Sequence, residues 1–168
     1  MKQFNDSLKE LNDSSVFKEW RKDNPKCYLS YGFIIVKGDD TWRIGYYHPD
    51  NQEVSSFLIA KEIIQEPTDE EAFQKPECDV KELKPKEIKT NCEDALKTAE
   101  KLQKEKSKQE IPLKIVVIVQ NHNELGNIWN ITYVTQNFKT LNIKVDAGSG
   151  DVLKDELIEL FHFDNRKE

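Results

Sequence analysis

The sequence predicts an α+β protein made of two α-β-β-β units, each with an antiparallel meander sheet packed on a helix. The pattern W-x-I-x-Y occurs twice, at Trp42–Tyr46 and at Trp129–Tyr133. The match continues without a gap into the alternating segments 54–58 and 141–145. Such an internal repeat indicates two copies of one supersecondary unit that pack into a single body. Short polar connections between the expected strands favour antiparallel pairing in each copy.

Composition restricts the function classes. The chain has 168 residues, a formal net charge of −6 and a sequence pI near 5.2, and its lysines are interspersed with acidic residues. This balance argues against sequence-independent binding to nucleic acid, which needs clustered Lys and Arg side chains. The first residues lack the apolar core of a signal peptide, and no later stretch approaches the roughly 20 apolar residues of a membrane span. We therefore expect a cytoplasmic protein with no nucleic-acid and no membrane partner.

The first unit is predicted to span residues 1–64. Ser14 or Ser15 can cap a helix that carries Val16, Phe17 and Trp20 on one stripe and ends at Asn24-Pro25. Leu8 and Leu11 suggest a further helical turn or two before it. Alternating apolar runs bounded by turn residues then predict three strands, at 27–36, 41–47 and 53–60.

Residues 65–89 are predicted to form a linker that contains three prolines and crosses one unit before the second begins. A capping pattern at Thr68 and Glu71 predicts a single helical turn within it.

The second unit is predicted to span residues 90–168. A capping box at Thr90 and Glu93 opens its helix, and strands are expected at 112–120, 128–135 and 140–147. The pattern of residues 152–161 leaves both helix and strand open.

Strand alternation separates two faces in each unit. Trp42, Ile44 and Tyr46 share one face and Trp129, Ile131 and Tyr133 share the equivalent face, which we interpret as the core side. The opposite faces are expected to differ. In the first unit this face carries Tyr47, Phe57 and Ile59, so we expect the N-terminal segment, the linker or a second subunit to cover it. In the second unit the face is polar, with Asn130, Thr132, Asn142, Lys144 and Asp146.

The second unit resembles the PepSY domain family. The resemblance rests on Glu93-x-Ala95-Leu96-x-x-Ala99, on the strand Trp129–Tyr133 and on 141–152, where Asp146-Ala147 leads into a turn at Gly150. It implies a PepSY-like, or cystatin-like, packing of a helix on a curved sheet. In such a turn the Asp can accept backbone N–H bonds and Gly tolerates positive φ. Family members often occur beside secreted peptidases, with a role in restraining the protease, or as add-on modules of exported proteins.

No pattern predicts a catalytic site, a metal site or a cofactor. His48, His122 and His162 lack the close spacing of metal ligands, and the cysteines Cys27, Cys78 and Cys92 lack CxxC spacing. Among the cysteines, Cys92 is the best candidate for a reactive thiol because a helix N-terminus favours the thiolate.

These observations predict a non-enzymatic protein or peptide interaction module. The candidate binding residues are Asn130, Thr132, Asn142, Lys144 and Tyr47, and the predicted partners are a protein, a peptide or a second copy in a homodimer. One alternative is a small-ligand binder or enzyme with its pocket between helix and curved sheet. Another is a dimerisation scaffold that buries the apolar face of the first unit.

Overall fold

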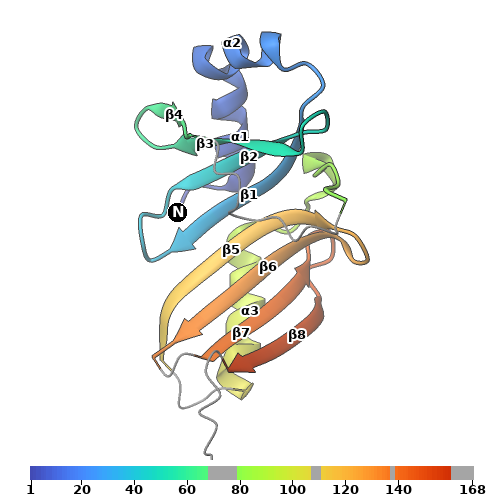
Figure 1. The fold of residues 1–168 in the computed structure, drawn as a ribbon. Helices are drawn as coiled ribbons and strands as arrows, with labels where there is room; N and C mark the ends of the chain where they lie inside the picture. Colours follow the sequence, from blue (N-terminus) through green and yellow to red (C-terminus); the bar gives the residue numbers. More distant parts are fainter. Residues whose placement is uncertain (68–78, 107–110, 137–138, 160–168) are drawn as a thin grey trace, which may run out of the picture.

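Three helices lie on one face of a single eight-stranded antiparallel sheet in the computed structural model, which describes residues 1–67, 79–106, 111–136 and 139–159 (Figure 1). The helices are α1 (Phe4–Asp13), α2 (Ser15–Asp23) and α3 (Cys92–Lys106), with a short 3₁₀ turn η1 (Pro85–Glu87) before α3. The strands are β1 (Tyr28–Val36), β2 (Trp42–His48), β3 (Glu53–Ile59), β4 (Ile63–Gln65), β5 (Pro112–His122), β6 (Gly126–Thr135), β7 (Lys139–Asp146) and β8 (Val152–Glu159). The predicted α+β class with meander connections is confirmed.

The prediction of two separate α-β-β-β units is wrong, and the sequence left open whether their sheets are continuous. The strand order is β4-β3-β2-β1-β5-β6-β7-β8, so the first strands of the two repeats pair with each other and join both halves. Phe33 of β1 lies opposite Ile118 of β5 near the centre of this junction. The pairing removes two long apolar edges, which separate sheets would have left open to solvent.

In the structure, the helix of the first copy that is equivalent to α3 is α1. The sequence pattern favours α2 as that helix instead. The indole Nε1 of Trp42 donates to the carbonyl of Lys2, just before α1, at 2.8 Å. The indole Nε1 of Trp129 donates to the carbonyl of Thr90, just before α3, at 3.0 Å. Helix α2 is an addition to the repeat, and it covers the part of the sheet nearest β4 (Figure 1).

Helix α2 begins as predicted, because the Ser14 hydroxyl accepts a hydrogen bond from the backbone N–H of Phe17. Phe17 and Trp20 are buried, while Val16 points away from the core. The cap of α3 is Asn91 rather than Thr90. Its Oδ1 accepts from the backbone N–H of Asp94 at 2.9 Å.

Residues Phe57 and Ile59 lie on the helix side of the sheet, which corrects the expected apolar outer face of the first unit. Phe57 is opposite Ile44, and Ile59 is opposite Trp42. The two copies differ because residues 49–52 connect β2 to β3, whereas the longer segment 135–139 links the paired ends of β6 and β7. The gapless alignment of the two repeats assumes connections of equal length. One extra residue in a connection moves each side chain of the following strand to the opposite face of the sheet.

A single hydrophobic core extends under both halves. The Phe4 ring lies 5.3 Å from the Trp42 ring and 6.5 Å from the Trp129 ring, measured between centroids. It packs directly on Gly32 of β1, where a Cβ atom would come within 2.3 Å of Phe4 Cε2. The residues predicted to face inward in both W-x-I-x-Y strands are buried, as expected.

The described part of the linker packs on the end of the sheet where β1 and β5 meet. The backbone N–H of Leu83 donates to the carbonyl of Leu29, and Asn121 Nδ2 donates to the carbonyl of Glu82, both at 2.8 Å. Leu83 is buried in the core. The predicted helical turn at Thr68 lies outside the described residues.

The turn between β7 and β8 has the predicted chemistry. Asp146 Oδ1 accepts from the backbone N–H groups of Gly148 and Ser149 at 2.8 and 2.7 Å, and Gly150 has φ +82°. The carbonyl of Ala147 accepts from the N–H groups of Lys89 and Thr90, so the turn also anchors the start of α3. The chain then continues as the strand β8, which settles the open assignment at 152–159. None of the described helices is long and apolar enough to cross a bilayer.

Candidate functional site

The face of the sheet opposite the helices, called the outer face here, is a broad surface on which no described helix packs (Figure 1). One row of side chains crosses it from edge to edge, as the pairing of neighbouring strands shows. From β8 to β4 the row is Lys154, Lys144, Asn130, Ile118, Phe33, Arg43, Leu58 and Ile64. Its β8 end is polar and charged, and its centre is apolar.

Four of the five predicted binding residues form one cluster on this face. Asn142 Nδ2 donates to Asn130 Oδ1 at 2.6 Å and to Thr132 Oγ1 at 2.9 Å. Lys144 Nζ donates to Asn142 Oδ1 at 3.2 Å. We call Asn130, Thr132, Asn142 and Lys144 the amide cluster. All four are half-buried by their neighbours within the sheet.

Tyr47 does not join the amide cluster. It lies on β2, three strands away from β6 in the sheet order, and its ring packs against Tyr28 at 5.5 Å between centroids. The sequence placed Tyr47 on the correct face, but the strand order separates it from the other four.

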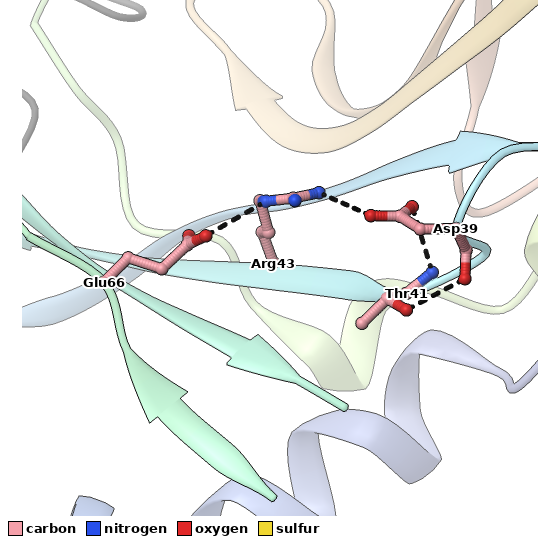
Figure 2. Close-up of polar contacts among 4 residues, drawn as sticks. All are labelled: Asp39, Thr41, Arg43 and Glu66. Atoms are coloured by element: carbon pink, nitrogen blue, oxygen red, sulfur yellow. Dashed lines mark hydrogen bonds and ion pairs between the residues drawn. The ribbon is translucent and has the colours of Figure 1, made fainter. Parts of the chain in front are cut away.

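A second polar group on the outer face is centred on Arg43, as Figure 2 shows. Its Nε lies 3.2 Å from Glu66 Oε1 and its Nη1 lies 3.3 Å from Asp39 Oδ2. Thr41 holds the Asp39 loop through its hydroxyl, which donates to the Asp39 carbonyl. The guanidinium carbon also lies 5.8 Å from the Phe33 ring centroid, a distance typical of cation–π contacts. These contacts hold the Arg43 guanidinium between Glu66, Asp39 and the Phe33 ring.

An apolar strip separates the two polar groups. It consists of half-buried residues of β1 and β5, namely Phe33, Ile35, Val116 and Ile118. This strip is absent from the sequence-based predictions. The available signal was the run Ile115–Val119, which is apolar at consecutive positions and therefore supplies apolar side chains to both faces of a central strand.

A small cavity lies on the helix side, between the N-termini of α1 and α3. Its volume is about 190 Å³, and Phe4, Asp6, Ile88, Cys92 and Trp129 are among the residues that line it. Ligand pockets commonly enclose about 300–1,000 Å³. This cavity is therefore small for the predicted alternative, a ligand site between helix and sheet.

Cys92 is the first residue of α3, but its environment contradicts the expected reactivity. The side chain is fully buried, and burial, reinforced by nearby Glu93, raises the pKa of its thiol to about 12. The effect of burial outweighs the helix terminus, so the thiol stays protonated at neutral pH. Cys27 is also buried, which raises the pKa of its thiol. Cys78 lies outside the described residues.

The other candidate groups for chemistry are held in structural contacts. His48 Nε2 is 2.8 Å from Ser55 Oγ, and His122 Nδ1 accepts from the backbone N–H of Glu124. Burial raises the pKa of the inward-facing Tyr133 to about 12. Within the described ranges, no group of three or more His, Cys, Asp or Glu side chains could hold a metal ion. His162 lies outside those ranges.

Comparisons with known proteins extend to the fold alone. No family model matches the chain, and no curated protein matches it. Among solved structures, the chain is similar to the crystal structure of a "putative lipoprotein" from Clostridium difficile 630, with a TM-score of 0.53 and 14% sequence identity. The match covers 85% of this chain and 90% of that one. The architecture therefore recurs in a protein of very different sequence.

Proposed function

We propose that the protein is a non-enzymatic interaction module that binds a protein or an extended peptide across its outer face. The observation that carries this proposal is the apolar strip on β1 and β5, which lies between the amide cluster and the Arg43 group. Interaction sites commonly combine an apolar centre with a polar rim.

The amide cluster favours a partner that presents hydrogen-bond acceptors. Asn142 uses its amide hydrogens on Asn130 and Thr132, and its oxygen accepts from Lys144. Within the described part of the chain, the Nδ2 of Asn130 and the hydroxyl hydrogen of Thr132 have no acceptor. Both groups are donors. Backbone carbonyls of a peptide, or its acidic side chains, would complete these two bonds.

The experiment compares the wild-type protein with the variant T132R/N142R in quantitative pull-downs from lysate of the cells that produce it. Two bulky cations in the amide cluster, beside the apolar strip, should remove the partners that bind there. The matched control S15R/N123R adds the same charge at exposed positions on α2 and in the β5–β6 loop. Partners that remain on T132R/N142R at wild-type levels would refute the outer face as the binding site.

The alternative of a small-ligand site rests on the cavity between α1 and α3. It makes a different prediction, since backbone amide shifts of Asp6, Thr90 and Asn91 in NMR spectra would respond to the ligand. The outer-face proposal expects the largest shifts on β1, β5 and β6 instead.

A further inference from the structure

We infer that β8 pairs with β8 of a second copy of the chain in antiparallel orientation, centred on Asp155, and so joins two eight-stranded sheets into one. This inference goes beyond the proposed function because it concerns the edge of the sheet rather than its outer face. The occupant is a second copy because the charge and apolar pattern of the strand complements itself in one register.

The two edges of the sheet are protected to different degrees. At one edge β4 has three residues, Ile63–Gln65. At the other, β8 runs over eight residues, Val152–Glu159, and no described strand pairs with its outer side. A long edge strand presents unpaired N–H and C=O groups that can pair with another strand.

The side chains of β8 add an apolar contribution at this edge. Leu153 is 42% exposed, Leu157 is 52% exposed and Ile158 is 44% exposed, although all three belong to β8. Exposed apolar side chains on an unpaired edge favour pairing with a complementary strand.

Geometry restricts the registers that a symmetric antiparallel pair can adopt. In an antiparallel pair, two residues that lie opposite each other both direct their N–H and C=O groups toward the partner strand, or both direct them away from it. In a symmetric pair of identical strands, opposite residues are therefore an even number of positions apart in the sequence. The pair can therefore be centred on Lys154, Asp155, Glu156 or Leu157, but not between two of them.

Only the register centred on Asp155 pairs apolar residues with apolar residues, and positive charges with negative charges, on both sides of its centre. In it, Lys154 lies opposite Glu156 of the second copy, and Leu153 lies opposite Leu157, and each pair occurs twice. Centring on Lys154 or Glu156 places a charged residue opposite a leucine or isoleucine. Centring on Leu157 places Glu156 opposite Ile158. Opposite charges and apolar pairs directly across a ladder stabilise it, and like charges destabilise it.

The two Asp155 residues at the centre are already neutralised within each chain. Asp155 Oδ2 forms an ion pair with Lys106 Nζ of α3, and the Asp155 side chain is 25% exposed. Each carboxylate therefore approaches its symmetry mate together with a cation. The register shift of β8 opposite Lys144 and Val145 falls at Leu153 and ends the regular ladder there, so Leu153 and Leu157 form the outermost pair of the inferred interface.

The test uses charge exchange across the inferred ladder, with the full chain, by analytical ultracentrifugation at micromolar to millimolar concentrations. Wild type should show a reversible dimer. K154E places two glutamates opposite each other twice, and E156K does the same with two lysines, so each single variant should dimerise about tenfold more weakly or worse. The control K101E makes the same charge change on the exposed face of α3 and should behave as wild type.

Two complementary samples identify the register. An equimolar mixture of K154E and E156K should form a heterodimer, because each position 154 then faces an opposite charge at position 156. The double variant K154E/E156K should recover the homodimer. A wild-type monomer at all concentrations would overturn the inference, and so would a dimer that K154E and E156K leave unchanged, or a mixture that stays monomeric. Loss of partners from T132R/N142R without loss of the dimer would separate this edge from the proposed binding face.

Discussion

Trp42 and Trp129 occupy equivalent positions in the two halves, and each indole donates to the carbonyl that precedes a helix. The Nε1–O distances are 2.8 Å to Lys2 and 3.0 Å to Thr90. The repeated W-x-I-x-Y strand therefore fixes where each helix begins, in addition to packing under it.

We predict that Trp129→Phe destabilises the protein more than a comparable substitution of another core tryptophan. The variant loses ring volume and leaves the part-buried Thr90 carbonyl without its donor, for a total cost of about 2–4 kcal/mol. Trp20→Phe is the matched control. Within the described residues, its indole N–H has no acceptor, so that variant loses volume alone. Urea denaturation followed by circular dichroism measures both changes. Equal destabilisation by the two substitutions would contradict a role for the Trp129 hydrogen bond.

Gly32 and Phe4 are predicted to be energetically coupled. A Cβ atom at Gly32 would overlap the Phe4 ring, so Gly32→Ala should displace α1 and cost about 1–3 kcal/mol in free energy of unfolding. In the double variant Gly32→Ala/Phe4→Leu, the smaller side chain makes room for the new methyl group. The cost of the double variant should therefore be less than the sum of the two single costs. Strictly additive costs would show that the overlap is relieved elsewhere.

The sequence predicted local structure better than it predicted the assembly of the sheet. The Ser14 cap, the start of β5 at Pro112 and the Asp146 turn depend on residues close together in the chain, and all three are confirmed. The pairing of β1 with β5 depends on contacts between distant segments, for which turn and periodicity rules give no direct signal. The apolar outer-face residues Phe33 and Ile118 were the available indication that both strands lie inside a sheet.

The candidate site shows the same limit. Asn130, Thr132, Asn142 and Lys144 belong to one hairpin, so strand alternation is enough to bring them together. The predicted face of Phe57 is wrong because the alignment of the two repeats assumes connections of equal length. Because the connection between β6 and β7 has one additional residue, side chains of β3 and β7 at aligned positions lie on opposite faces of the sheet.

Asp146 is predicted to hold the β7–β8 turn and, through it, the start of α3. Asp146→Ala removes the acceptor of two backbone N–H groups, at Gly148 and Ser149, and should cost about 1–3 kcal/mol. Asp146→Asn keeps an acceptor oxygen in place and should cost less. Hydrogen exchange should accelerate at Lys89 and Thr90, whose N–H groups bond to the Ala147 carbonyl. Faster exchange confined to the turn would contradict the coupling to α3.

Substitutions at the neighbouring residues Asn142 and Ile143 are predicted to have different effects, because Asn142 lies on the outer face and Ile143 lies in the core. Ile143 is fully buried, so Ile143→Ala should cost about 2–5 kcal/mol in stability. Asn142→Ala removes half-buried polar contacts and should cost about 1 kcal/mol or less. The same Asn142→Ala variant should weaken partner binding if the amide cluster forms part of the site. Thermal denaturation and the pull-down assay measure the two effects on the same samples, and a large loss of stability in Asn142→Ala would mark the cluster as structural.

Stability is predicted to fall at alkaline pH through buried groups that resist ionisation. Burial raises the pKa of the Cys92 thiol from its ordinary value of 9.0 to about 12, and it raises the pKa of Tyr46 and Tyr133 to about 12 as well. The unfolded chain loses these protons first, so the native state binds more protons and the free energy of unfolding decreases as pH rises. For Cys92 the loss begins near pH 9 and continues toward pH 12, at up to about 1.4 kcal/mol per pH unit.

The variant Cys92→Ala isolates the thiol from the two tyrosines. It should be less stable than wild type at neutral pH, because it loses buried volume, yet its stability should decline less steeply just above pH 9. Urea denaturation across this range gives both values, and alkylation by iodoacetamide gives an independent readout. Native Cys92 should react more slowly than a small free thiol, because little thiolate is present, and should react at the ordinary rate once the chain is unfolded. Parallel pH profiles for wild type and Cys92→Ala, or rapid native alkylation of Cys92, would show that the thiol ionises in the folded protein.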